Sequence, residues 1–352
     1  MIKNVNINKI VRLADWKNYI IPFLLGIVFL SVYIYEIPFA LSLKVTGLLL
    51  ISIIGTAAYG YLLNNIFDLE EDKRAGKNNF TENLPELIKI LFVVVSLVTA
   101  LLPWLFLSVA FLNFGLFILQ LILLTIYCIP PLRLKKFICA GIIADALYNS
   151  VIPVFVIVFI IREYAVIIPE TGSLIITVLF FTLLLKGLRG ILLHQLADRK
   201  NDGKAGVHTF ALYHGALKTF NLTNRVILPL EMIFNVVLTS LLSKHLPGIS
   251  WLFIIFFFYK ALKLRFWNIR YLCRWEFKFY RFIFLQSMND WYEEWLPLYT
   301  LIVLVVKDIS FLFLLIPYIL LFPAFFKKFL NEIPEAIVNF RNDLKNKFLK
   351  RC

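Results

Sequence analysis

Long runs of apolar residues, separated by short polar segments that are mostly basic, dominate the chain. A bilayer core about 30 Å thick needs roughly 20 apolar residues in a helix. Runs of this kind predict membrane spans near residues 19–35, 41–63, 87–108, 112–129, 140–161, 173–193, 224–242, 249–265, 289–306 and 309–327. The pattern therefore predicts an all-α fold, a polytopic membrane bundle of nine to ten transmembrane helices around a central cavity.

The composition supports this reading. Hydrophobic residues make up 61% of the 352 residues and charged residues only 16%, whereas soluble domains are about 45–50% apolar and about 25% charged. This balance excludes a soluble globular domain. The cysteines have neither metal-ligand nor redox spacing, so we expect no disulfide framework. They are Cys128, Cys139, Cys273 and Cys352.

The basic residues behind the net charge of +14 fall mostly on one side of the predicted membrane spans. If the N-terminus is cytoplasmic, the outer loops between spans contain only three basic residues, Arg162, Lys244 and Lys307. The positive-inside rule then predicts a multi-pass protein, expected in the plasma (cytoplasmic) membrane, with cytoplasmic N-terminus and motif loops. The cations therefore indicate topology, and we expect no nucleic-acid partner. A basic tail on the same side favours ten spans, although nine remains an alternative.

Two of the cytoplasmic loops repeat one pattern of polar residues. The copies are Asn64-x-x-x-Asp68-x-x-x-Asp72-x-x-x-Gly76 and His194-x-x-x-Asp198-x-x-x-Asp202-x-x-x-Gly206. Both follow a span that runs inward, so the copies are parallel, an arrangement that builds membrane proteins around a shared site.

The spacing of the aspartates has a chemical meaning. Residues four apart share one helix face, so each copy presents two carboxylates together at the membrane edge. Four carboxylates brought together need cations between them, and Mg²⁺ prefers a few carboxylates combined with substrate phosphates. The repeat thus predicts two aspartate pairs that bind a diphosphate through Mg²⁺. The alternative interpretation is that both segments are solvated helix ends.

These motifs resemble the UbiA superfamily of intramembrane prenyltransferases. Two further segments are similar to motifs in that superfamily, and the resemblance extends from about residue 12 to about residue 306. The segments are Arg12-x-x-x-Trp16 before the first span and Tyr127-Cys-Ile-Pro-Pro-Leu-Arg-Leu-Lys135 after the fourth.

The resemblance implies Mg²⁺-dependent transfer of a prenyl group from a prenyl diphosphate to a lipophilic or aromatic acceptor. It implies that the metal and diphosphate are held by Asn64, Asp68, Asp72, Asp198 and Asp202. Arg133 or Lys135 would neutralise the leaving diphosphate and Tyr127 would orient it. Membrane lipids are the other expected partners, and no obligate protein partner is inferred.

The chain also departs from the pattern of the superfamily. Asn65 stands where aspartate is frequent, and the loop after Asp72 lacks the His-Pro or Arg-Pro of many members. Lys77 is a candidate for the missing cation. Residues 307–352, which we expect to form an additional span and an amphipathic basic tail, extend beyond the UbiA-like domain of residues 1–306.

Other polar residues within or beside the spans are functional candidates by default. Arg189 is a candidate for diphosphate binding, with snorkelling to the interface as the alternative. His194 is a candidate for binding metal or diphosphate or for carrying a proton, and a structural role is the alternative. Asp145 and Asn149 are candidates for binding the acceptor or serving as a base for its proton, and packing between helices is the favoured alternative. For residues 290–295, rich in tryptophan and acidic residues, we expect an interfacial anchor, with a portal as the alternative.

Two other functions fit part of the pattern. Trp16-Lys17-Asn18 resembles members that transfer phosphoribose to a polyprenyl phosphate, although the missing His-Pro segment argues against that reaction. A non-enzymatic transporter is the third hypothesis. The aspartates are expected at the membrane edge, whereas transporter sites lie near the midplane, so we favour prenyl transfer.

Overall fold

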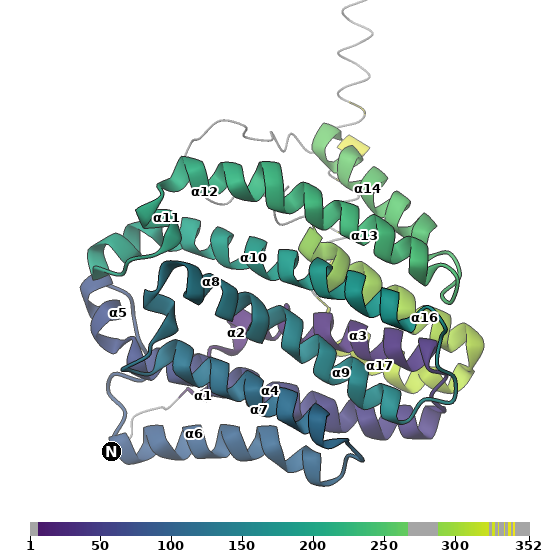
Figure 1. Cartoon of the computed structure of the whole chain (residues 1–352), viewed down its shortest axis with the longest axis horizontal. Coiled ribbons are helices and arrows are strands. Elements are labelled where there is room, and N and C mark those ends of the chain that lie inside the picture. Colours follow the sequence, from purple (N-terminus) through teal and green to yellow (C-terminus); the bar gives the residue numbers. More distant parts are fainter. Residues whose placement is uncertain are drawn as a thin grey trace, which may run out of the picture.

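The computed structural model describes residues 6–266 and 288–323, together with isolated positions between residues 326 and 341. All regular structure in these residues is helical, as the hydrophobic pattern predicts. The long helices lie side by side, and the short helices α5 and α11 lie together at one end of the bundle (Figure 1). We call this end the motif end, because both aspartate motifs lie there.

The chain forms its helices in the following order. The first half contains α1 (Ile7–Ile10), α2 (Leu13–Trp16), α3 (Ile20–Ile34), α4 (Phe39–Phe67), α5 (Leu69–Ala75), α6 (Glu86–Leu101), η1 (Leu102–Leu105), α7 (Phe111–Cys128), η2 (Leu134–Lys136), α8 (Ile138–Ala146), η3 (Leu147–Val151) and α9 (Ile152–Glu163). The second half contains α10 (Gly172–Ala205), α11 (Phe210–Tyr213), α12 (Ala216–Leu222), η4 (Thr223–Ile227), α13 (Leu228–Leu242), α14 (Ile249–Phe266), η6 (Trp291–Trp295), α16 (Leu296–Lys307), η7 (Ile309–Phe311) and α17 (Leu312–Leu321).

Six helical segments in the described residues are long and apolar enough to cross a membrane, and three further apolar helices are shorter. The long segments are Phe39–Phe67, Glu86–Leu105, Phe111–Cys128, Ile138–Glu163, Gly172–Ala205 and Ala216–Leu242. Each of the ten predicted spans coincides with helix over most of its described length. The predicted amphipathic tail, residues 333–349, lies almost entirely outside the described residues.

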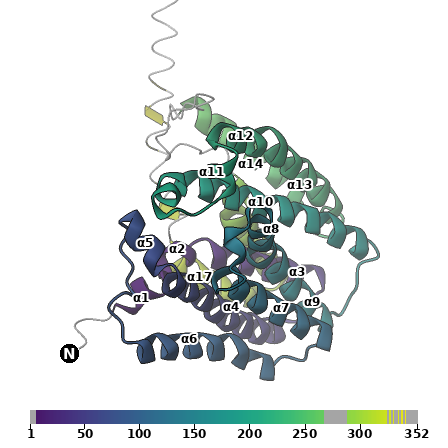
Figure 2. The ribbon, with the colours of Figure 1, turned by 60° about the vertical axis from the view of Figure 1, so that its left-hand side comes forward.

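Helix α3 forms the centre of the bundle. Its residues from Ile21 to Val32 are all buried, because it packs against α4, α9, η6 and α16. Figure 2 shows it in the interior from a second direction. An apolar sequence on all sides of a helix is typical of such a buried position. Helix α6 differs, because Leu87, Val94 and Val98 expose about half or more of their surface, as expected for a lipid-facing helix.

Three spans contain a π turn directly before a proline. The turns η3, η4 and η6 precede Pro153, Pro229 and Pro297, each the second residue of the following helix. Proline has no N–H to donate and its ring crowds the carbonyl four residues earlier, and a π turn accommodates both effects. Since π turns often occur at functional sites, the polar residues they contain, Asn149 and Glu293 among them, are of interest.

Candidate active site

The first motif lies at a break between two helices. Asp68 ends α4 with φ −97° and ψ 3°, and Asp72 lies one turn later in α5. The second motif lies instead within α10, which continues without a break to Ala205. The expected stacking of both aspartates on one helix face therefore applies to Asp198 and Asp202, whereas the first pair spans a helix junction.

The two copies nevertheless end in the same local geometry. Gly76 and Gly206 have φ values of 70° and 72°, the left-handed region that glycine adopts without a Cβ penalty. In each copy the next residue donates its backbone N–H to the carbonyl of the second aspartate, at 2.9 Å from Lys77 to Asp72 and at 2.9 Å from Val207 to Asp202. The repeat detected in the sequence is thus also a structural repeat.

All four motif aspartates line one chamber of about 760 Å³ at the motif end, which we call the motif chamber. Helices α5 and α10 pack against each other and bring the two copies together. Asn64, Tyr127 and His194 also line this chamber. The structure therefore gathers into one space the five residues that the resemblance assigned to the metal, namely Asn64 and the four aspartates.

Basic side chains occupy positions between these carboxylates. Lys77 Nζ lies 2.9 Å from Asp198 Oδ2, so the loop after the first motif reaches the second. Arg133 Nη2 lies 3.0 Å from Asp68 Oδ1, and Lys135 contacts the same oxygen. Of these last two cations, Lys135 lines the motif chamber. Lys77 and Lys135 therefore line the motif chamber beside the aspartates, whereas Arg133 contacts Asp68 from outside it.

Glu71 is a site residue that the sequence reasoning missed. Its side chain is 9% exposed and accepts hydrogen bonds from Arg133 at 2.9 Å and from Lys135 at 3.2 Å. It therefore anchors the basic loop to the first motif. The signal was its position three residues after Asp68, which places both carboxylates on the same side of the chain where helix α5 begins.

The environment of Asp72 disfavours its charge. Burial raises the pKa of the Asp72 carboxyl, the hydrogen bond that Asn79 donates opposes this effect, and the charge of Asp68 raises the pKa further. The bond from Asn79 Nδ2 measures 2.8 Å, and the same amide donates to the carbonyl of Asn65 at 2.7 Å. Asn65, where the superfamily often has aspartate, donates in turn to the carbonyl of Ile10 at 2.9 Å. Its amide thus attaches the N-terminal segment to the motif.

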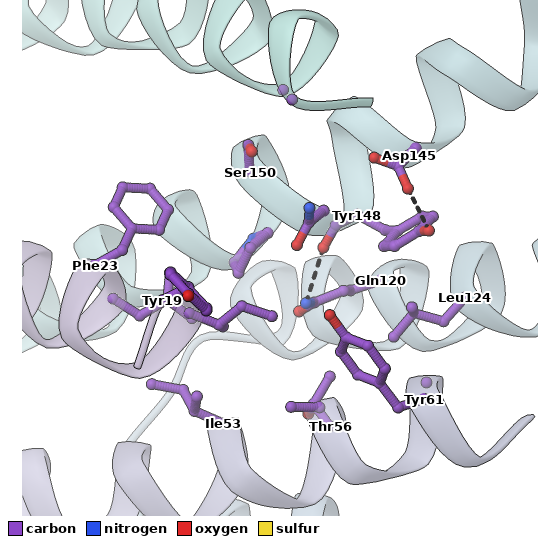
Figure 3. A pocket seen from close by; sticks show the side chains of 18 of the residues that line it. Tyr19, Phe23, Ile53, Thr56, Tyr61, Gln120, Leu124, Asp145, Tyr148 and Ser150 are labelled. Atoms are coloured by element: carbon purple, nitrogen blue, oxygen red, sulfur yellow. Dashed lines mark hydrogen bonds between the residues drawn. The ribbon is translucent and has the colours of Figure 1, made fainter. Parts of the chain in front are cut away.

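A second chamber of about 710 Å³, which we call the inner chamber, extends from the motif end into the bundle. Figure 3 shows its wall, with Tyr19 and Phe23 on one side, Thr56 and Tyr61 from α4, and Tyr148 from η3. Asn64, Tyr127 and His194 line both chambers. A molecule bound across this boundary would have one end among aspartates and the other among apolar and aromatic side chains.

The residues predicted to bind the acceptor, Asp145 and Asn149, lie in the wall of the inner chamber. Asp145 accepts a hydrogen bond of 2.6 Å from the Tyr148 hydroxyl, and Asn149 lies in the adjacent π turn. Tyr127 packs edge-on against Tyr148 with ring centroids 5.2 Å apart. His194 Nε2 lies 3.8 Å from Asp198 Oδ2. All four positions are therefore close enough to the chambers for the roles suggested from the sequence.

Arg189 is placed differently. It is fully buried and pairs with Glu231, with Nε and Nη2 at 2.6 Å and 3.0 Å from the two carboxylate oxygens, and Nη2 also donates to Asn289 at 2.8 Å. It lines neither chamber. This placement indicates a structural ion pair and gives no support to a contact between Arg189 and a diphosphate.

The donor set of the motif chamber fits a hard divalent cation. Four carboxylates and the Asn64 amide supply oxygen ligands, which Mg²⁺ prefers. Within residues 6–266 and 288–323, however, no group of three or more His, Cys, Asp or Glu residues is arranged to hold a metal ion. An ion shared between protein carboxylates and substrate phosphates needs fewer protein ligands, so the arrangement suits binding of metal and diphosphate together.

Comparison with known proteins identifies the family. The sequence model of the UbiA prenyltransferase family matches residues 20–286, and the chain belongs to this family. The membrane-length helices and this membership make it an integral membrane protein. No curated protein matches the chain significantly.

Solved structures share the fold. A UbiA homologue from Archaeoglobus fulgidus bound to GPP and Mg²⁺ is 15% identical, with a TM-score of 0.57 over 84% of this chain and 98% of that chain. The same homologue bound to DMAPP and Mg²⁺ gives 16% identity and 0.57 over 85% and 99%. A structure described as digeranylgeranylglyceryl phosphate synthase gives 17% identity and 0.52 over 84% and 95%.

Proposed function

We propose that the protein transfers a prenyl group from a prenyl diphosphate to a lipophilic, aromatic acceptor within the membrane and releases diphosphate, with Mg²⁺ as cofactor. The observation that carries this proposal is the position of all four motif aspartates around one chamber that continues into an aromatic and apolar one. The family and the GPP and DMAPP complexes of the Archaeoglobus homologue support it.

The residues of this chain divide the task. Asp68, Asp72, Asp198 and Asp202, with Asn64, hold the metal-bound diphosphate in the motif chamber. Bound Mg²⁺ supplies positive charge that stabilises the leaving diphosphate. Lys77 and Lys135 hold its remaining oxygens, because fixed cations stabilise negative charge as it develops. Tyr127, at the boundary of the two chambers, orients the diphosphate.

The inner chamber takes the hydrocarbon part of the donor. Ile53 and Leu124 line it on the side of α4 and α7, and Trp104 and Phe117, which stack with centroids 4.4 Å apart, line its apolar wall. Burial of apolar surface stabilises a prenyl chain there by about 25 cal/mol per Å². Near the boundary with the motif chamber, where the allylic carbon would lie, the face of Tyr127 is placed to stabilise positive charge on that carbon.

The experiment that tests the function is product analysis. Purified protein in lipid nanodiscs is incubated with Mg²⁺, a prenyl diphosphate and candidate acceptors, and lipid-soluble products are identified by mass spectrometry. We expect a product heavier than the acceptor by one prenyl group, formed only with Mg²⁺. Formation of a glycolipid from phosphoribosyl diphosphate and polyprenyl phosphate, without any prenylated product, would contradict the proposal.

We also propose that the protein lies in the plasma membrane and that its motif end faces the cytoplasm. Cys139, exposed at the start of α8, follows the basic segment η2 and offers a probe of this side. In a variant that retains only this cysteine, we expect a membrane-impermeant maleimide to label it in inverted vesicles and not in intact cells. Labelling in intact cells would show that the motif end faces the outside and would contradict this proposal.

A further inference from the structure

Two charged side chains face the inner chamber without a hydrogen-bond or ion-pair partner among the described residues. Lys186 lies in α10 and Glu293 in the π turn η6, and both line the chamber. No hydrogen bond within 3.5 Å and no ion pair within 4.0 Å joins either side chain to any described residue. Since charged groups inside a membrane are rare and costly unless paired or functional, this pair requires an explanation.

Packing fixes the place of the pair. Lys186 Nζ lies over the ring of Phe23, 4.0 Å from its centroid, and 5.6 Å from the centroid of Tyr292, the neighbour of Glu293. Among the surrounding carboxylates, Glu293 acts most strongly on the charge of Lys186, and Lys186 is the cation that acts most strongly on Glu293. The two groups therefore belong to one corner of the chamber, where α3, α10 and η6 meet.

A neighbouring cation on α10 differs from Lys186 because it has protein partners. Arg189, one turn further along α10, donates hydrogen bonds to Glu231 and Asn289. The same helix thus carries one cation whose partners are supplied by the protein and one whose donors point to no described acceptor. The sequence reasoning considered only the first of these for the site and expected Glu293 at a membrane interface.

The helix also leaves room beside Lys186. Gly190 lies one turn from Lys186 and one turn from His194 on the same face of α10, and a Cβ at Gly190 would meet no atom within 4 Å. A flat ring whose polar edge contacts Lys186 would extend over Gly190 toward His194 and the motif chamber. The eight residue steps from Lys186 to His194 correspond to about 12 Å of helix, which is enough for one ring or for two fused rings.

The chemistry of the pair selects the class of ligand. An ammonium group donates hydrogen bonds and a carboxylate accepts them, so the complementary group has an oxygen that accepts and a hydroxyl that donates. The pair has no net charge, whether the proton is held by Lys186 or by Glu293. It therefore offers no excess charge to compensate a carboxylate or phosphate, and burying an uncompensated anion is strongly unfavourable.

We propose that Lys186 and Glu293 bind the polar edge of a neutral, hydroxylated aromatic acceptor, whose ring lies over Gly190. This inference rests on the proposed prenyl transfer and specifies its second substrate. Phe23 and Tyr19 supply aromatic surface around the ring. A free phenol or quinol fits these groups, whereas an acceptor with a carboxylate or a glycerol phosphate does not.

The test measures binding rather than turnover. The probes are 2,6-dihydroxynaphthalene and 3,7-dihydroxy-2-naphthoate, which is the same ring with a carboxylate added, and binding to protein in nanodiscs is measured by equilibrium dialysis. We expect wild-type protein to bind the neutral probe at least about tenfold more tightly. Lys186→Met and Glu293→Gln should each raise its Kd by about tenfold, the usual effect of losing a hydrogen bond to a charged group.

Two further variants test the space for the ring and provide a control lysine outside the site. Gly190→Val fills the open space without a backbone clash, so it should fold and still weaken binding of the neutral probe. Lys307→Met removes a lysine that pairs with Glu36 outside both chambers and should leave binding unchanged. All four variants should bind a Mg²⁺–prenyl thiolodiphosphate within about twofold of wild type, because none of them changes the motif chamber or the inner-chamber wall proposed for the prenyl chain, Ile53, Leu124, Trp104 and Phe117.

The outcomes separate the two proposals. Equal binding of the neutral probe by wild type, Lys186→Met and Glu293→Gln, or preference of wild type for the carboxylate probe, would overturn the assignment of this site. Binding of the neutral probe through Lys186 without prenyl transfer to any acceptor would retain the site and overturn the proposed function. Transfer with an acceptor KM unaffected by either variant would retain the function and overturn the site.

Discussion

Lys77 Nζ lies 2.9 Å from Asp198 Oδ2, and this ion pair connects the loop after the first aspartate motif to the second motif, 121 residues away. The two copies of the repeat are therefore joined by a cation as well as by packing. In the proposed reaction the same lysine meets the diphosphate, so Lys77 acts at the contact between the two halves of the site.

The first prediction concerns this lysine. Lys77→Met should raise the KM for the prenyl diphosphate by about tenfold, because a charge-assisted hydrogen bond to the substrate is lost. Thermal stability should change little, since the side chains are 37% and 29% exposed and such pairs contribute about 1 kcal/mol or less. Steady-state kinetics and heating followed by size-exclusion chromatography measure both quantities.

Lys73→Met is the matched control for this prediction. Lys73 pairs with Glu82 at 3.2 Å in the same region of the chain and does not line the motif chamber. Its KM should equal that of wild type. An equal loss in both variants would mean that Lys77 acts only through the general charge of the loop.

The second prediction concerns Glu71, the buried carboxylate that anchors Arg133 and Lys135. Glu71→Gln weakens both charge-assisted contacts, so turnover should fall by about tenfold as the basic loop loses its fixed position. Glu70→Gln, at the exposed neighbouring position, should retain wild-type turnover. If Glu71→Gln turns over at the wild-type rate, the basic loop does not need this anchor.

The third prediction separates structural from functional charges on α10. Arg189→Met leaves Glu231 buried without its partner, and removing one member of a buried ion pair costs about 3–5 kcal/mol. We therefore expect a clearly lower thermal midpoint for Arg189→Met and an almost unchanged one for Lys186→Met. Unchanged stability of Arg189→Met would contradict the structural role of the pair.

The sequence contained most of the information on the fold. Apolar runs of membrane length predicted the spans because burial in lipid imposes length and composition directly. The repeat predicted which aspartates meet, and its matched glycines have the same left-handed conformation in both copies. These features depend on local spacing, which a single sequence displays.

Features that depend on long-range packing were not accessible in this way. The helix break at Asp68, the burial of Glu71 and the pairing of Arg189 with Glu231 all arise from contacts between distant helices. Trp291, expected in an interfacial anchor, is instead 2% exposed and packs edge-on against Phe253 at 4.7 Å. The hydropathy of the sequence assigns such a segment to the membrane edge because the segment contains several charged residues. Whether those charged side chains face a chamber is decided by packing.

The central claim is that two aspartate pairs bind one metal–diphosphate for prenyl transfer. The most direct measurement is the release of diphosphate from a labelled prenyl diphosphate, with acceptor present, by purified protein in nanodiscs as Mg²⁺ is titrated. We predict Mg²⁺-dependent release by wild type and a loss of at least about a hundredfold in both Asp68→Asn and Asp198→Asn, since electrostatic stabilisation of a leaving group is usually a dominant contribution. Release at the wild-type rate by either variant, or release that does not depend on Mg²⁺, would contradict the claim.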